Sequence, residues 1–202
     1  MKVLLVARNP ELASAWKQEF FRYPQVSIIP GSIFDVEADA LATPANSFGN
    51  MDGGLDGLMR NHFGLEVESR LRQQLADHYF GELPVGLAVV VETGNPRHPY
   101  MVSAPTMRFP ATVAHTVNAY LAMKAILHAG LRHPDISSIA IPGLCTLSGG
   151  MTADRAARQM RIAYERVVLG QYAYSHWREE RAFEDFIRGV TPFPPEDLER
   201  GL

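Results

Sequence analysis

Apolar positions along the chain follow two alternating patterns, which together predict strands that alternate with helices. Short apolar runs that end at Pro, Gly or polar residues are typical of buried strands, and apolar residues repeated every three or four positions are typical of helices. The clearest helix covers residues 152–169, where Thr152 is the expected N-cap and Gly170 the expected stop. The predicted strands cover residues 3–7, 26–29, 40–42, 85–92, 100–104 and 137–142, and the predicted helices cover residues 10–20, 55–63, 66–79, 111–132, 152–169 and 177–188.

This alternation favours one α/β domain over residues 1–170. Because alternating elements place helices on both faces of a sheet, we expect a three-layer α/β/α sandwich with a mixed sheet of about six strands. Residues 171–202 are expected to form a C-terminal extension, with a helix that Ser175 caps and a loosely held tail after it. Apolar side chains of that helix would dock it on the domain: Trp177, Phe183, Phe186 and Ile187.

Composition limits the class of protein. The 202 residues are 47% hydrophobic and 20% charged, which suits a single globule with one sizeable core. A net charge of -3 gives no basic field for general nucleic-acid binding. Four arginines gather on the helix over residues 152–169, where we expect them to form its solvated face: Arg155, Arg158, Arg161 and Arg166.

The class of protein is limited further by the cysteines, the histidines and the first residues of the chain. One cysteine cannot form an internal disulfide, and no Cys or His spacing resembles a metal site, so we expect neither a metal nor a cofactor. The first eight residues contain a short apolar run without the length of a signal peptide or a membrane span. We therefore expect a cytoplasmic protein with no membrane partner.

A first candidate site lies in residues 38–64, ADALATPANSFGNMDGGLDGLMRNHFG. Asn46 follows a short apolar strand, at the strand end where open α/β sheets bind ligands. Gly53 and Gly54 lack a Cβ, so a bound group can approach their amides closely at the start of a helix, an arrangement that suits phosphate. Asp56 lies in the first turn of that helix, where it can hold a water or a ribose hydroxyl.

A second candidate loop, residues 143–150, also joins a strand to a helix. It offers glycines and the hydroxyls of Thr146 and Ser148 at a second helix N-terminus. Taken singly, each residue of the two segments is more often an ordinary turn or cap residue. Cys145 is either a nucleophile favoured by the helix N-terminus or a small residue that fills the loop. Taken together, the two loops are placed to hold a diphosphate from both sides.

These segments resemble the macro domain, an α/β module that binds ADP-ribose. The resemblance rests on GSI at 31–33, ADALATPAN at 38–46, GGLDG at 53–57 and PGLCTLSGG at 142–150, and further segments resemble a bacterial or phage-associated branch. It implies that Asn46 and Asp56 are catalytic and that ADP-ribose or an ADP-ribosylated substrate is the partner. The implied ligand-binding set is Ser32, Ile33, Ala45, Asn46, Gly53, Gly54, Leu55, Gly143, Cys145, Thr146, Leu147, Ser148, Gly149, Gly150 and Met151.

The chain departs from the family pattern at three positions. Ser32 stands where an Asp usually bonds the adenine amino group, Leu147 stands where a glycine is usual, and Gly149 stands where many members carry an aromatic residue. We expect the Leu147 side chain to narrow the site. The residue that would stack on adenine is not assigned, and Tyr172, Tyr174 and Phe109 are its candidates.

Two function classes use the same pocket. A hydrolase would cleave an ADP-ribosyl bond at the distal ribose, where the Asp56 carboxylate would hold the attacking water and stabilise positive charge on the sugar. A binding module would recognise ADP-ribose through the same contacts without turnover. A third reading is a phage-derived accessory protein with a decayed pocket, which Ser32 and Leu147 favour. The sequence favours the hydrolase.

Overall fold

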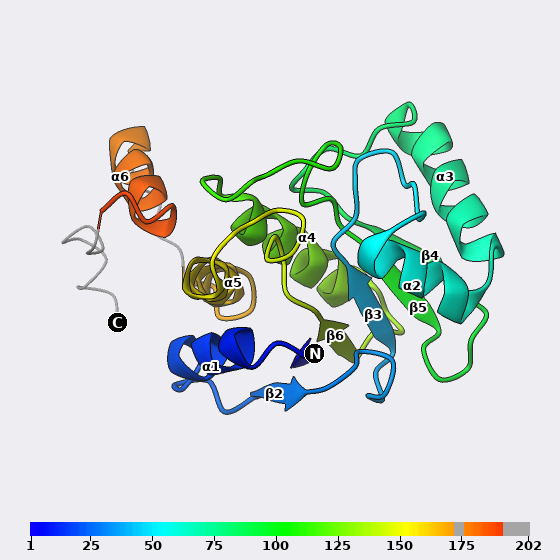
Figure 1. The fold of residues 1–202 in the computed structure, drawn as a ribbon, viewed down its shortest axis with the longest axis horizontal. Coiled ribbons are helices and arrows are strands. Elements are labelled where there is room, and N and C mark those ends of the chain that lie inside the picture. Colours follow the sequence, from blue (N-terminus) through cyan, green and yellow to red (C-terminus); the bar gives the residue numbers. More distant parts are fainter. Residues whose placement is uncertain (172–175, 192–202) are drawn as a thin grey trace.

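The computed structural model describes residues 1–171 and 176–191, and within them the chain forms one six-stranded mixed sheet (Figure 1). The strand order is β2-β1-β6-β3-β5-β4. All neighbouring strands pair in parallel except β4, which runs antiparallel to β5. The strands are β1 (Lys2–Ala7), β2 (Val26–Pro30), β3 (Ala40–Thr43), β4 (Val89–Glu92), β5 (Tyr100–Ser103) and β6 (Ser138–Ile141).

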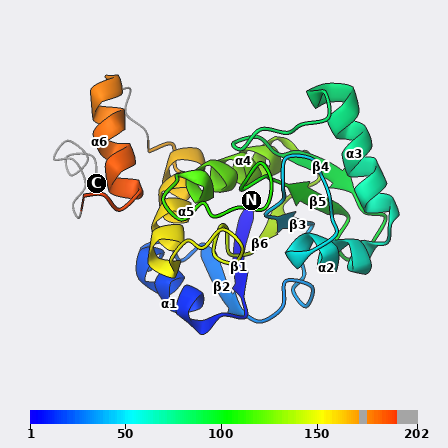
Figure 2. The ribbon, with the colours of Figure 1, turned by 45° about the horizontal axis from the view of Figure 1, so that its top comes forward.

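Helices cover both faces of this sheet, as Figures 1 and 2 show. One face is covered by α1, α4 and α5 and the other by α2 and α3, and a separate cluster of buried apolar side chains fills each interface. The predicted three-layer α/β/α sandwich is therefore confirmed. The helices are α1 (Pro10–Glu19), α2 (Gly54–Phe63), α3 (Glu66–Tyr79), α4 (Asn118–Arg132), α5 (Ala153–Val167) and α6 (Trp177–Ile187).

Two predicted elements begin too early. The helix expected from residue 111 starts at Asn118, because residues 111–117 form a loop whose Val113 amide donates to the Gly149 carbonyl at 2.8 Å. The strand expected from residue 85 starts at Val89, because Gly86 has a φ of +101 that breaks the extended backbone. The loop over residues 111–117 is thereby tied to the second candidate loop.

The C-terminal helix α6 packs against α5 at the edge of the molecule, away from the sheet (Figure 2). Phe183, Phe186 and Ile187 are buried in the core cluster on the α5 side, as expected. The expected docking of Trp177 is wrong, since this residue is 61% exposed. His176 caps the helix and accepts a hydrogen bond from the Arg178 amide, while the predicted cap Ser175 and residues 192–202 lie outside the described residues.

The arginines of α5 are not a solvated face. Arg161 donates to Glu19 of α1 at 2.7 Å and also pairs with Glu165, and Arg166 pairs with Glu180 of α6 at 3.3 Å. The side chains of Arg161 and Arg166 are only 21% and 19% exposed. The α5 arginines therefore join α5 to its neighbouring helices, which a helical wheel of one segment does not reveal.

Candidate active site

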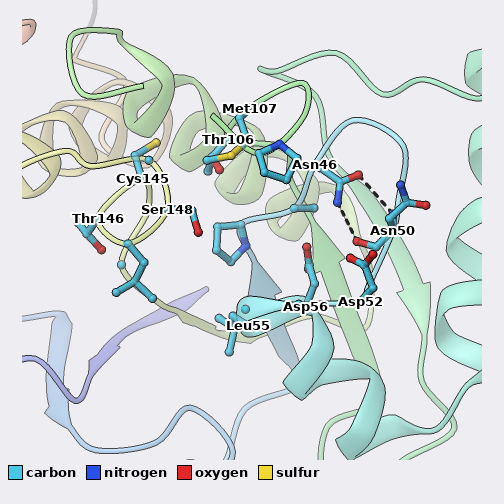
Figure 3. Close-up of a pocket in the computed structure, with 18 residues that line it drawn as sticks. Asn46, Asn50, Asp52, Leu55, Asp56, Thr106, Met107, Cys145, Thr146 and Ser148 are labelled. Carbon is cyan, nitrogen blue, oxygen red and sulfur yellow. Dashed lines mark hydrogen bonds between the residues drawn. The ribbon is translucent and has the colours of Figure 1, made fainter. Parts of the chain in front are cut away.

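The candidate site lies where the carboxyl ends of the parallel strands β3, β5 and β6 meet at one edge of the sheet. The loops after these strands surround a cavity of about 240 Å³ (Figure 3). Three segments line it, residues 44–56, 106–110 and 143–149. The lining residues are Pro44, Ala45, Asn46, Asn50, Asp52, Gly53, Gly54, Leu55, Asp56, Thr106, Met107, Pro110, Gly143, Cys145, Thr146, Leu147, Ser148 and Gly149.

Asn46 organises the first loop with its side-chain amide. Its Oδ1 accepts hydrogen bonds from the amides of Phe48 and Asn50, at 3.0 and 3.3 Å, and its Nδ2 donates to the Asn50 carbonyl at 2.7 Å. A carboxamide has two N–H donors and one oxygen with two lone pairs. Only one N–H of Asn46 is therefore free for a ligand, so Asn46 can offer a hydroxyl group a donor but no acceptor.

The N-terminus of α2 presents free backbone amides to the cavity. Gly53 occupies the cap position with an extended backbone and supplies no side-chain cap. No amide of residues 52–56 donates a hydrogen bond within the part of the chain that the structure describes. Free amides at a helix N-terminus, together with the helix dipole, favour an anion. An added Cβ at Gly53 or Gly54 would meet nothing within 4 Å, so this side of the cavity is open to a bound group.

The second loop adds another run of free amides. None of the amides of residues 143–149 donates a hydrogen bond to the described residues, whereas the amides of Gly150 and Met151 are satisfied within the loop. An added Cβ at Gly149 would lie 2.6 Å from the Cys145 carbonyl oxygen, so only glycine allows this tight fold. In Figure 3, Cys145, Thr146 and Ser148 lie across the cavity from Asp52 and Asp56. The two runs of amides thus form two sides of one anion site.

Asp56 is the half-buried acid of the cavity. Its Oδ1 accepts a hydrogen bond from the Oγ1 of Thr43, the last residue of β3, at 2.6 Å. Burial raises the pKa of Asp56 to about 6, the Thr43 hydrogen bond opposes this rise, and the negative charges of Glu68 and Asp52 add to it. The carboxylate is therefore ionised at pH 7 while its pKa lies near the pH at which a general base works best.

Cys145 is a buried loop residue with a positive φ of 64. Burial raises the pKa of its thiol to about 12, so the thiol stays protonated at neutral pH. A protonated thiol is a poor nucleophile, so burial favours the interpretation of Cys145 as a small residue that fills the loop.

Leu147 lines the cavity, and its side chain is 80% exposed. The expectation that it narrows the site stays a prediction. Phe109, a candidate for stacking on adenine, is 55% exposed and does not line the cavity. The other two candidates, Tyr172 and Tyr174, lie outside the described residues.

The structure brings most of the predicted site residues together. Four of them do not line the cavity. Ile33 and Met151 are buried in the two cores, the Ser32 hydroxyl accepts a 3.4 Å hydrogen bond from the Phe34 amide, and Gly150 turns the loop with a φ of +67. Those in the cavity are Ala45, Asn46, Gly53, Gly54, Leu55, Asp56, Gly143, Cys145, Thr146, Leu147, Ser148 and Gly149. Their roles toward a ligand stay predictions.

Several lining residues were missed from the sequence. Asn50 and Asp52 stand between Asn46 and Gly53, so their polarity within the first motif was an available signal. Thr106, Met107 and Pro110 follow β5, whose place beside β3 the sequence does not reveal. An isolated bridge between Asn46 and Met107 continues the pairing of these strands into the cavity wall.

Within residues 1–171 and 176–191, no group of three His, Cys, Asp or Glu side chains is placed to hold a metal ion. No helix in the same described ranges is long and apolar enough to cross a membrane.

Comparison with known proteins identifies the family. The family model of the macro domain matches residues 42–160, so the chain belongs to the macro domain family. An uncharacterised protein of Aquifex aeolicus is 32% identical over 135 residues, which cover 67% of this chain and 78% of that protein. A macro domain-containing protein of Caldanaerobacter subterraneus is 29% identical over 135 residues, 66% of this chain and 75% of that protein.

Solved structures share the fold at lower identity. The macrodomain of Mycobacterium tuberculosis DarG matches with a TM-score of 0.56 and 20% identity, over 67% of this chain and 87% of that chain. Thermosipho africanus DarTG, solved in complex with ADP-ribose, matches with a TM-score of 0.56 and 16% identity, over 80% of this chain and 48% of that chain.

Proposed function

We propose that this protein binds ADP-ribose in the cavity and hydrolyses an ADP-ribosyl bond at the distal ribose. The observation that carries the proposal is the pairing of two runs of free amides, residues 52–56 and 143–149, with the Asp56 carboxylate beside them. Family membership and the complex of DarTG with ADP-ribose support this choice of ligand.

The diphosphate would be bound by the backbone. No Lys, Arg or His is among the described residues that line the cavity, so amides and the α2 dipole must offset the negative charge. The distal ribose would then lie beside Asn46 and Asp56, because these two residues line the same wall (Figure 3). The free N–H of Asn46 would donate to one ribose hydroxyl.

Hydrolysis requires one water and no metal in this scheme. The bond between the anomeric carbon and the leaving group breaks while the water oxygen bonds to that carbon. The Asp56 carboxylate stabilises the positive charge that develops on the sugar and accepts one proton from the water. The leaving group departs with the bonding electron pair and takes up a proton from the solvent, and Asp56 returns its proton to the solvent, which gives ADP-ribose, the unmodified target and the ionised carboxylate.

The experiment has a binding arm and a turnover arm. In calorimetric titration, ADP-ribose should bind more tightly than AMP, because the distal-ribose contacts are worth about 1 kcal/mol each. Turnover is measured as ADP-ribose released from ester-linked, phosphorylated and nucleic-acid substrates. Asp56→Asn should keep ADP-ribose affinity within about threefold and lose roughly 10²–10⁴ in turnover, the usual contribution of an acid–base group.

Asp154→Asn is the matched control, since Asp154 is an exposed acid in the first turn of α5 and does not line the cavity. It should leave both arms unchanged. Equal affinity for AMP and ADP-ribose would remove the distal-ribose assignment. A wild-type protein that binds ADP-ribose and releases none from all three substrates would be a binding module.

A further inference from the structure

Thr43, a buried residue that does not line the cavity, contacts Asp56 from the end of β3. It ends β3, is fully buried at 0% exposure, and its Oγ1 lies 2.6 Å from Asp56 Oδ1. Its backbone is fixed by the sheet, because the Thr43 carbonyl accepts hydrogen bonds from the amides of Ala45 and Ala104, at 3.0 and 3.1 Å. The hydroxyl therefore reaches Asp56 from a position that the sheet fixes, whereas Asp56 stands in the first turn of α2.

We propose that Thr43 is a positioning residue, which holds the Asp56 carboxylate in one orientation and leaves its second oxygen for the attacking water. The proposal rests on the function proposed above. A hydroxyl that donates to Oδ1 favours the ionised carboxylate, and it fixes the side-chain rotamer because the donor cannot move with α2. The sequence predicted a strand over residues 40–42, and nothing in that pattern marked Thr43 for the site.

The charges around Asp56 make this hydrogen bond important. Asp52 from the first loop and Glu68 from α3 both disfavour its ionisation. Glu68 is itself compensated by Arg60 of α2 at 3.1 Å and by a hydrogen bond from the Met51 amide at 3.0 Å. The Thr43 hydroxyl is the group that opposes burial and both carboxylates. Without it, burial and the charges of Asp52 and Glu68 would favour the protonated, inactive form with no side chain opposing them.

The test compares Thr43→Val, which keeps the shape and removes the hydroxyl, with Thr43→Ser, which keeps the hydroxyl. For the wild type, kcat/KM should rise with pH through a pKa of about 6, because only ionised Asp56 accepts the proton. Thr43→Val should move this inflection upward by about one unit, the equivalent of one hydrogen bond to a charged group. Thr43→Ser should restore the wild-type profile.

A second readout needs no turnover. The Asp56 carboxyl carbon is titrated by ¹³C NMR in the ligand-free protein, and its pKa should show the same upward shift in Thr43→Val and the same recovery in Thr43→Ser. ADP-ribose affinity at pH 8 should stay within about threefold in both variants. If Thr43→Val does not fold, Thr43→Ala takes its place.

The outcomes separate the two proposals. An Asp56 titration that does not move when the hydroxyl is removed would overturn the role of Thr43, whatever the activity. If the NMR titration moves as expected and the wild type releases no ADP-ribose, the coupling of Thr43 to Asp56 stands and the hydrolase function fails. A loss of kcat/KM in Thr43→Val at every pH, with no shift of the profile and no recovery in Thr43→Ser, would mean a purely structural residue.

Discussion

The buried environment that raises the pKa of Asp56 also lowers the stability of the folded protein when Asp56 is ionised. Its pKa rises from 3.8 in the unfolded chain to about 6 in the folded one, so the folded state binds its proton more tightly. Stability therefore falls as pH rises through this window, and the full penalty remains above pH 6. The shift of about two units corresponds to at most about 3 kcal/mol.

Asp56→Asn should therefore stabilise the protein at pH 8 and leave its stability nearly unchanged at pH 4. Asparagine keeps an oxygen that can accept the Thr43 hydrogen bond and removes the buried charge. Urea unfolding at the two pH values measures the difference. If Asp56→Asn is less stable than the wild type at pH 8, the folded state stabilises the ionised carboxylate, and the pKa of Asp56 is not raised.

At the scale of elements, the two glycine-containing loops have different physical requirements. Gly53 has a φ of -157, which any residue adopts, and an added Cβ there would meet nothing within 4 Å. Gly149 is closed in, since an added Cβ would lie 2.6 Å from the Cys145 carbonyl oxygen and 2.8 Å from Val113 Cγ2. The first glycine therefore leaves room for a ligand, and the second lets the loop fold.

The two alanine variants should separate these roles. Gly53→Ala should change unfolding free energy by no more than about 1 kcal/mol, the range of cap substitutions, and weaken ADP-ribose binding at least tenfold. Gly149→Ala should cost about 1–3 kcal/mol of stability, as overpacking does, and weaken binding through the loop. Thermal unfolding and calorimetric titration of both variants provide the comparison. An unaltered affinity in Gly53→Ala would place the anion away from α2.

The bounds of the helices show which elements local sequence patterns predict correctly. The helix over residues 66–79 was predicted with its observed bounds, because Val67, Leu71 and Leu75 repeat at the helical period and are all buried. The start of α4 was wrong, because the Val113 amide bonds to a loop distant in sequence. Phage association and a cytoplasmic location stay predictions.

The site was predictable where its residues lie close together in the sequence. Asn46 and Asp56 lie in one local motif, and the structure places both in the cavity. The Thr43 contact and the wall after β5 depend on strand order, which one sequence does not encode locally.

At the scale of the whole molecule, we propose that residues 1–170 form the macro domain and that α6 belongs to a C-terminal addition and docks on this domain. The contacts of α6 support this division. Arg188 donates to the His115 carbonyl at 3.0 Å, and the buried apolar face of α6 joins the core on the α5 side. None of these residues lines the cavity, so the addition stabilises the fold at a distance from the site.

The fully buried side chain of Gln159, on α5, connects this helix to α4, to the loop before α4 and to the end of α6. Its Oε1 accepts from the Tyr120 amide at 3.1 Å, and its Nε2 donates to the carbonyls of Thr116 and Ile187, at 2.8 and 3.1 Å. Leucine at this position would leave one N–H and two carbonyls without a partner, at about 1–3 kcal/mol each.

Gln159→Leu should accordingly destabilise the protein by at least about 3 kcal/mol and keep ADP-ribose affinity within about threefold below its melting temperature. Gln73→Leu is the control, because Gln73 is exposed on α3 and bonds only to Asp77 one turn away. Chemical unfolding followed by Trp fluorescence and by circular dichroism measures both variants. If α6 were an independent unit, the transitions followed by Trp fluorescence and by circular dichroism would separate; coincident transitions with the full loss mean that α6 and the sheet unfold together.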